Sequence, residues 1–235
     1  MTSEDDSTLK QALVRAGEKY RDRTTLRAAV QAIPYVGGPI DTLLSGHAGR
    51  RQEARFASFL DDLDNRLRRI EDQPKIEETD EFFDLILDVF ERVIRSRSRA
   101  KRERFAQIIV NQVQGGRDWD TAGEVVRLLD GLSDIHMEVL REALSAPPCD
   151  SPFDGLNVIS LAVDDLAGDD IIRPTKLKEA LPGYSAIALR MACSELVARG
   201  LLHDEGIGRW DFGALQYLVP TDLARWFVRQ VSGDT

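Results

Sequence analysis

The chain is predicted to be mainly α-helical, with an N-terminal helical bundle followed by a second domain of helices that carries a short β-hairpin. Two patterns predict this fold class. Between residues 56 and 129, apolar side chains recur at steps of three and four, which is the spacing of amphipathic helices. Residues 204–219 instead alternate as the strands of a hairpin do, with glycines between aromatic and aliphatic residues. We place the boundary near Gly131, giving domains 1–131 and 132–235.

The first domain is expected to contain three long helices and a shorter one. The first long helix carries an apolar stripe from Phe56 to Ile70 and ends at Gln73-Pro74. The second opens at Thr79, and the third buries residues between Phe105 and Val113 before it stops at two glycines. A further helix with apolar residues 125–129 leads to the boundary. The stripes are narrow enough to pack as a helical bundle.

The second domain is expected to begin with a helix around residues 135–144, which stops at two consecutive prolines. A second helix is expected over residues 159–166, and a third follows Pro174. Ser185 is a suitable N-cap for a longer helix, and Gly200 has the residue type that ends helices in the left-handed conformation. After the hairpin, a closing helix spans residues 223–231.

The order of segments in residues 133–232 is similar to that of winged-helix domains. The run "SELVARGLL", the glycine-rich hairpin and the run "YLVPTDLARWFV" resemble the recognition helix, the wing and the last helix. The resemblance implies a C-terminal winged helix-turn-helix domain with a short β-hairpin wing. Such domains commonly place the recognition helix in the DNA major groove, which would make Arg190, Arg199 and Arg209 the DNA contacts.

Charge argues against DNA as the partner of this domain. Phosphate contacts need lysines and arginines that are clustered on the docking face. Arg190 and Arg199 are opposed by Glu195, and the hairpin offers Arg209 among three acids. The whole chain has a net charge of -9. We therefore favour a protein-docking or regulatory role for this domain over nucleic-acid binding.

A dense basic run lies between the second and third long helices. Its members are Arg92, Arg95, Arg97, Arg99, Lys101, Arg102 and Arg104. If helix continued through the run, Arg92, Arg95, Arg99 and Arg102 would share one face and form an anion-binding site for lipid headgroups or nucleic acid. The alternative, which we favour, is a solvated helix end whose cations match the helix dipole and pair with nearby acids.

An apolar segment between residues 24 and 45 has the composition of a short helical hairpin. Pro34 and the pair Gly37-Gly38 break it into two halves. Its apolar residues are Leu26, Val30, Ile33, Tyr35, Val36, Ile40, Leu43 and Leu44. The hairpin is either a buried part of the bundle or a segment that inserts into a membrane interface, and Arg27, Gln31 and Asp41 limit how deeply it can insert.

Residues 24–113 resemble the helical N-terminal domain of bacterial proteins that are compared with the fungal HeLo cell-death domain, also called Bell domains. The resemblance rests on "AIPYVGGPIDTLL", "RRQEARFASFLDDLDNRL" and "TDEFFDLILDVFERVIRSRSRAKRERFAQIIVNQV". It implies a regulated domain that attacks or permeabilises membranes in bacterial defence. This chain departs from the pattern in one respect, because a polar segment, residues 7–20, precedes the apolar hairpin.

No catalytic constellation is found in the sequence. His47 lies in "SGHAGRR", which lacks the Gly-Lys-Ser/Thr of a phosphate loop, and neither His136 nor His203 has the cysteines or carboxylates of a metal site around it. Cys149 and Cys193 are expected to be a surface thiol and a core thiol. We therefore expect no enzyme activity, catalytic residue, metal, cofactor or small-molecule substrate. We expect a cytoplasmic protein that is recruited to the inner face of the membrane if the hairpin inserts.

Two functions remain open. The first is a HeLo-like effector or signalling protein that acts on membranes and is coupled to a winged-helix module that docks a protein partner or a second copy. The second is a transcriptional regulator whose bundle dimerises or senses a signal while the winged helix binds DNA. Salt dependence separates them, because duplex binding loses affinity steeply as salt rises.

Overall fold

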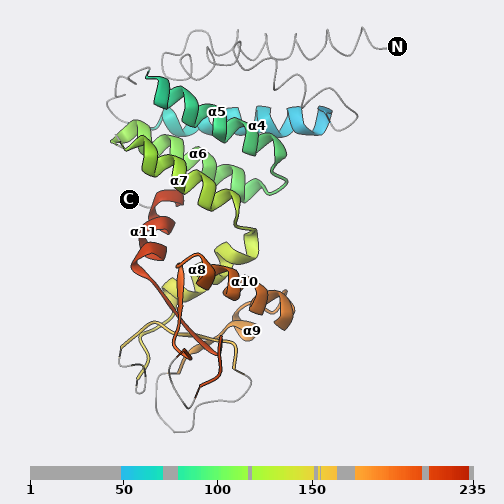
Figure 1. Ribbon diagram of the computed structural model, residues 1–235. Coiled ribbons are helices and arrows are strands. Elements are labelled where there is room, and N and C mark those ends of the chain that lie inside the picture. Colours follow the sequence, from blue (N-terminus) through green and yellow to red (C-terminus); the bar gives the residue numbers. More distant parts are fainter. Residues whose placement is uncertain are drawn as a thin grey trace. The chain divides into compact units, whose positions relative to one another are not determined.

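The computed structural model describes residues 49–70, 79–115, 118–150, 153, 155–162, 173–207 and 212–232. These residues are mainly helical, with a small four-stranded sheet on the C-terminal side, which confirms the predicted helical class (Figure 1). The chain divides into two compact units, Met1–Gly131 and Leu132–Thr235. The apolar hairpin expected over residues 24–45 lies outside the described residues.

The described part of the first unit is a helical bundle. Its helices are α4 (Gly49–Leu67), α5 (Asp80–Arg95), α6 (Arg99–Gln114) and α7 (Trp119–Asp130). Helix α4 packs against α5 and α6, and α7 packs against the same two helices. Phenylalanines fill the centre, and the ring of Phe56 meets that of Phe90 edge-on at 5.0 Å between centroids. Each fully buried phenylalanine contributes roughly 1.5–3 kcal/mol through the hydrophobic effect.

Side-chain caps set where three of these helices begin. The Oγ1 atom of Thr79 accepts the backbone N–H of Phe82 at 3.3 Å, so α5 opens at the residue that the sequence indicated. Ser98 caps α6 in the same way, and Asp118 caps α7. These bonds satisfy N–H groups that have no partner within the helix.

The second unit packs its helices around α8 (Asp134–Ser145). This helix contacts α9 (Leu177–Ala180), α10 (Ala186–Ala198) and α11 (Asp222–Val231). Ser185 caps α10, accepting the N–H of Ala188 at 3.1 Å, and Gly200 adopts the left-handed conformation just beyond it, with a φ of 72°. Both ends of α10 therefore lie where the sequence predicted them.

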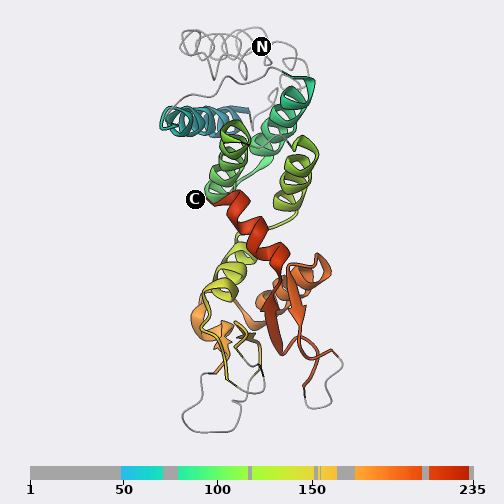
Figure 2. The same cartoon turned by 90° about the vertical axis from the view of Figure 1, so that its left-hand side faces the viewer.

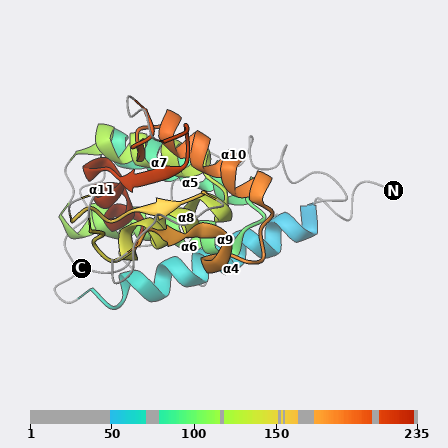
Figure 3. The same cartoon turned by 90° about the horizontal axis from the view of Figure 1, so that it is seen from below.

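A four-stranded sheet completes the second unit, in the order β2-β1-β4-β3. The strands are β1 (Ile159–Ser160), β2 (Thr175–Lys176), β3 (Leu202–Asp204) and β4 (Tyr217–Pro220). Strand β4 is antiparallel to both of its neighbours, whereas β1 and β2 are parallel. Figure 2 shows β3 and β4 running side by side, and Figure 3 shows β1 next to β4 from below.

The expectation of a helix over residues 159–166 is wrong at its start. Ile159 and Ser160 form β1, with Ile159 opposite both Leu218 and Thr175. Val158 and Ile159 are fully buried. Two successive buried β-branched residues fit a strand that is covered on both faces, and the pairing with β4 outweighs any local preference for helix.

One buried carboxylate fixes the base of the β3–β4 hairpin. Asp204 accepts the N–H of Gly206 at 2.9 Å through Oδ1 and the N–H of Leu215 at 2.7 Å through Oδ2. A Cβ atom on Gly206 would lie 2.3 Å from the carbonyl oxygen of Gly213, so only glycine fits at this position. The hairpin predicted from the sequence thus forms, as part of a larger sheet than expected.

Candidate functional site

The predicted anion-binding face is interrupted by a break in the helix. We call residues 92–104 the α5–α6 elbow, because α5 ends at Arg95 and α6 begins only at Arg99. The N–H of Ser96 closes the end of α5, and the hydroxyl of Ser98 starts α6. Arg92 and Arg95 therefore belong to a different helix from Arg99 and Arg102, and the four do not share one helical face.

Two cations of the elbow are bound to the last residue of α7. Arg92 pairs with Asp88 at 2.9 Å and also with Asp130. Burial disfavours the charged form of Arg92, but the two carboxylates outweigh it and raise the pKa of the guanidinium. Lys101 donates to the backbone carbonyl of Asp130 at 2.5 Å, and its Nζ lies 3.8 Å from the carboxylate. These contacts hold α5, α6 and the end of α7 together.

Arg102 is buried under the elbow and donates to the backbone carbonyls of its linking residues. Only 9% of it is exposed, and its Nη1 donates to the carbonyls of Ser96, Arg97 and Ser98 at 3.1, 3.3 and 3.3 Å. Burial and the nearby charges of Arg55 and Arg99 lower the pKa of this guanidinium. Through these carbonyl contacts, Arg102 holds the three residues that link α5 and α6 in place.

Two exposed arginines of the elbow, Arg95 and Arg99, have acidic neighbours on their own helices. Arg99 pairs with Glu103 at 2.8 Å, and Arg95 lies 3.9 Å from Glu91. Such surface pairs contribute little stability, typically less than about 1 kcal/mol, but they offset the charge that an anion would meet. The arrangement supports the solvated, paired interpretation of the basic run.

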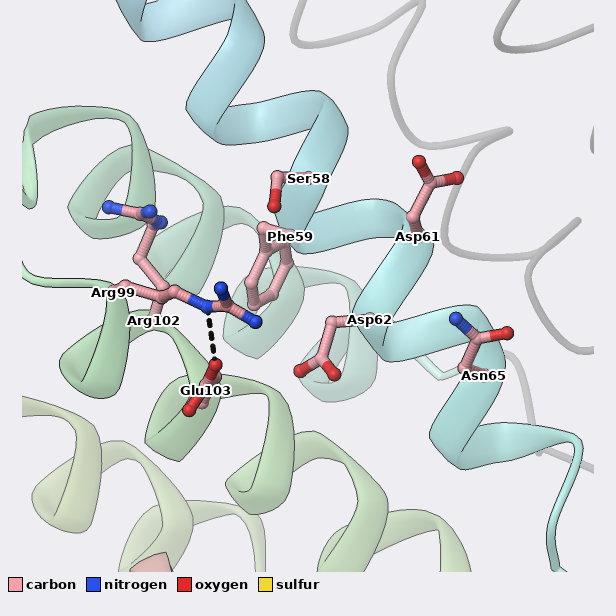
Figure 4. A pocket seen from close by; sticks show the side chains of 8 residues that line it. All are labelled: Ser58, Phe59, Asp61, Asp62, Asn65, Arg99, Arg102 and Glu103. Carbon is pink, nitrogen blue, oxygen red and sulfur yellow. Dashed lines mark hydrogen bonds and ion pairs between the residues drawn. The ribbon is translucent and has the colours of Figure 1, made fainter.

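A polar pocket of about 220 Å³ lies between α4 and α6. Figure 4 shows its lining residues, which are Ser58, Phe59, Asp61, Asp62, Asn65, Arg99, Arg102 and Glu103. Asp62 points toward Arg99 and Glu103, whereas Asp61 points away. Asp62 is already bound to Arg66 at 2.8 Å, and Arg99 to Glu103. The pocket brings together only two of the four predicted anion-binding residues, and their charges are engaged within the protein.

Among the described helices of the second unit, α10 carries the large apolar side chains with the highest exposed fractions, and they lie on its outer face. Ile187 is 74% exposed and Met191 is 60% exposed, one helical turn apart. The opposite side of α10 is buried through Leu189, Ala192, Cys193 and Leu196. Sequence reasoning placed Ile187 and Met191 on this helix but did not identify the exposed surface that they form. The available signal was that apolar residues occur on two opposite sides of α10, although only one side can face the core.

The described cations predicted to touch DNA do not form one surface. Arg190 and Arg199 are both exposed. They are nine positions apart, which is about two and a half helical turns, so they project from opposite sides of α10. Arg209 lies outside the described residues. On the outer face of α10, Arg190 therefore stands beside Met191 rather than in a cluster of cations.

A buried histidine ties α8 to α10. The Nδ1 atom of His136 accepts the backbone N–H of Ser133 at 3.1 Å and lies 2.7 Å from the Ser133 hydroxyl. We therefore assign the ring proton to Nε2, which lies 3.0 Å from Oε2 of Glu195. The serine, histidine and glutamate are arranged as a helix cap and an interhelical contact.

The two thiols of the described ranges lie inside the protein. Cys149 and Cys193 are both buried, so the expectation of a surface thiol at Cys149 is wrong. Cys149 lies in a small core with Phe153, Val158 and Tyr217 that the sequence did not reveal. Within the described ranges, no three His, Cys, Asp or Glu side chains gather as metal ligands would.

No protein-family model, curated protein or solved structure matches this chain. Among the helices that the structure describes, none has the length and apolar content needed to cross a bilayer. The predicted membrane-inserting residues, from Leu26 to Leu44, lie outside the described ranges.

Proposed function

We propose that this chain is a non-enzymatic effector or signalling protein in which a winged-helix-type module docks a protein through the outer face of α10. The observation that carries the proposal is the exposure of Ile187 and Met191 on that face. Large apolar side chains exposed together are typical of protein contact sites, whereas a DNA-reading helix needs cations and polar groups there.

The topology of the second unit supports the winged-helix assignment. A short helix, α9, and a turn through Pro182-Gly183 precede α10, and the β3–β4 hairpin follows it. Strand β1 pairs with β4 and not with β3. In the resemblance to winged-helix domains, α10 takes the place of the recognition helix and β3–β4 the place of the wing.

The charge of the second unit supports a protein partner over DNA. Residues 132–235 contain 9 lysines and arginines against 16 aspartates and glutamates. Non-specific DNA affinity depends on cations that replace the counterions of the phosphates. An acidic module with Arg190 and Arg199 on opposite sides of α10 is repelled by the duplex rather than attracted to it.

A duplex-binding measurement tests this choice. We expect the anisotropy of a labelled random duplex to stay unchanged at low and at physiological salt when the full chain is added. Binding that falls steeply with salt, and that Arg190→Glu abolishes, would contradict the docking proposal. It would favour the alternative function, a winged-helix transcriptional regulator with a helical dimerisation or sensor domain.

We further propose that the helical unit acts on membranes and that the second unit controls it. The support is the resemblance of residues 24–113 to HeLo-like domains, together with the apolar segment that contains Val30 and Leu43. An apolar segment interrupted by a few charges is suited to an interface or an oligomeric assembly, because a charge at the bilayer centre costs at least about 2.5 kcal/mol.

Dye release from anionic and neutral liposomes tests the membrane activity. We expect release by the full chain or by residues 1–131, once circular dichroism shows that the fragment is folded, and stronger release from anionic vesicles. Val30→Asp and Leu43→Asp should abolish release while the helical signal is retained. If both proteins are folded and neither releases dye, the membrane proposal fails. If the two substitutions unfold the bundle, the segment belongs to its core.

A further inference from the structure

The exposed face of α10 has the residue spacing of a coiled-coil seam. Ile187, Met191, Ser194 and Ala198 are all exposed, at successive steps of four, three and four. Steps of this kind keep one stripe of a helix facing a second helix. The stripe is apolar at its first two positions and small at its last two, so two backbones can approach closely near the C-terminal end of α10.

Two opposite charges border this seam on opposite sides. Arg190 precedes Met191 on one side of the stripe, and Glu195 follows Ser194 on the other. In heptad terms they occupy the g and e positions. When two parallel helices pair, the g residue of one faces the e residue five positions later on the other. Arg190 of each copy would therefore meet Glu195 of the second copy, twice across a two-fold axis.

We propose that the outer face of α10 pairs with the same face of a second copy of this chain, with the two helices parallel. The inference rests on the proposed docking role of α10 and names its partner. The face is its own complement, because the apolar stripe meets itself and each charge meets its opposite, as a two-fold symmetric contact requires. A different protein would have to supply an apolar surface with opposite charges placed to match Arg190 and Glu195.

Glu195 can serve both its own chain and the second copy. Its side chain is 51% exposed while one oxygen, Oε2, lies 3.0 Å from Nε2 of His136. A carboxylate has two oxygens and accepts several donors, so the guanidinium of Arg190 can bind the exposed one. The contact with His136 also holds Glu195 at the edge of the seam, which reduces the entropy lost when the pair forms.

The expected association is weak and depends on protein concentration. Helix α10 has 13 residues, which is less than two full heptads, and a stable interface needs more than about 1,000 Å² of buried surface. Sedimentation velocity from about 1 μM to 1 mM covers the affinities expected of such a small contact. The full chain should pass from monomer to dimer within that range.

Charge exchange between two variants gives the sharpest test. Arg190→Glu places acid against acid across the seam, and Glu195→Arg places base against base. Each variant alone should dimerise at least tenfold more weakly than the unaltered chain. An equal mixture should recover dimers near the original affinity, because opposite charges face each other again. Arg141→Glu, which makes the same charge change on α8, is the matched control and should leave dimerisation unchanged.

A second pair of variants does not disturb His136. Ile187→Ser and Met191→Ser alter exposed side chains, so both should fold, and each should weaken dimerisation at least tenfold. If Glu195→Arg fails to fold, these two variants still test whether α10 forms the dimer contact. Dimers that tolerate these changes would place the contact elsewhere and overturn the inference.

Three other results would also overturn the pairing of α10 with itself. They are a monomer at every concentration, a dimer indifferent to Arg190→Glu, and a mixture of the folded charge variants that stays monomeric. A monomer without duplex binding leaves docking of a different protein standing, whereas salt-dependent duplex binding through α10 removes the docking proposal itself. The two failures are therefore distinguishable.

Discussion

The α5–α6 elbow and the outer face of α10 differ in whether their characteristic side chains already have partners within the protein. The elbow is the most basic stretch of the sequence, yet Arg92, Lys101 and Arg102 are bound to acids or carbonyls of their own unit. Helix α10 has an ordinary sequence, yet it leaves Ile187 and Met191 uncovered. A charge cluster is thus a poor guide to a binding surface unless its partners are known, and uncovered apolar area is a better one.

The largest effect is expected from removing the guanidinium inside the elbow. Arg102→Met removes the guanidinium that donates to three carbonyls, of which that of Ser98 keeps the backbone N–H of residue 102 as a donor. Because hydrogen bonds to charged groups contribute about 1.5–3 kcal/mol, we expect the free energy of unfolding to fall by about 2 kcal/mol. Urea denaturation followed by circular dichroism measures it.

Arg99→Met is the matched control for this prediction, because the Arg99 side chain is 83% exposed. Its cost should stay within about 0.5 kcal/mol. If the two substitutions lower the free energy of unfolding equally, Arg102 does not hold the elbow. The comparison of a bound elbow with an uncovered α10 face would then lose its main support.

An intermediate effect is expected from Asp130→Asn. This change removes the carboxylate shared by Arg92 and Lys101, and since Asp130 is partly exposed we expect a loss of at most about 1 kcal/mol. Because Arg92 and Lys101 each lose one negative partner, the substitution should also strengthen binding to anionic vesicles in a sedimentation assay. Glu124→Gln, on the same helix, is the control, because Glu124 pairs with Arg127 outside the elbow. Unchanged vesicle binding by Asp130→Asn would show that the elbow has no latent anion site.

The smallest effect on folding stability at neutral pH is expected from the thiol of Cys193 on the inner side of α10. Burial raises the pKa of Cys193 from about 9 to about 12, so the thiol stays neutral in the folded protein while it ionises in the unfolded chain above pH 9. Folding stability should therefore be unaffected by this group below pH 9 and should fall as pH rises from about 9 toward 12.

Urea unfolding at several pH values measures this slope, and Cys193→Ala should reduce it. In the same samples, maleimide labelling at pH 8 should be slow for both buried thiols until the protein unfolds. Fast labelling of Cys193 in the folded protein would mean that the inner side of α10 opens, and that its two sides differ less than the structure indicates.

Local signals predicted most of the helices of this fold. Thr79, Ser185 and Gly200 mark helix ends by bonds or dihedral angles that involve only nearby residues, and the structure has them in those roles. The strand at Ile159 was missed because its partners, Thr175 and Leu218, are 16 and 59 residues away in sequence. Short segments take the structure that their distant neighbours require.

The same distinction explains what the sequence revealed of the candidate sites. The basic run was visible in the sequence, but Asp130, the acid that binds two of its members, comes 29 residues after Lys101. The exposure of Ile187 and Met191 could not be read from the sequence because α10 has apolar residues on two opposite sides, and only packing decides which side the core covers. Single-sequence patterns find candidate residues, and the fold determines which of them remain available.

The attachment of Asp130 has a mechanical consequence for the chain. Asp130 is the last residue of α7 and directly precedes Gly131, where the first compact unit ends. Arg92 and Lys101 anchor it to α5 and α6. A pull on the link between the units is therefore carried into two helices of the bundle at once. Conversely, a change that displaces α5 or α6 also displaces the end of α7, from which the chain continues into the second unit.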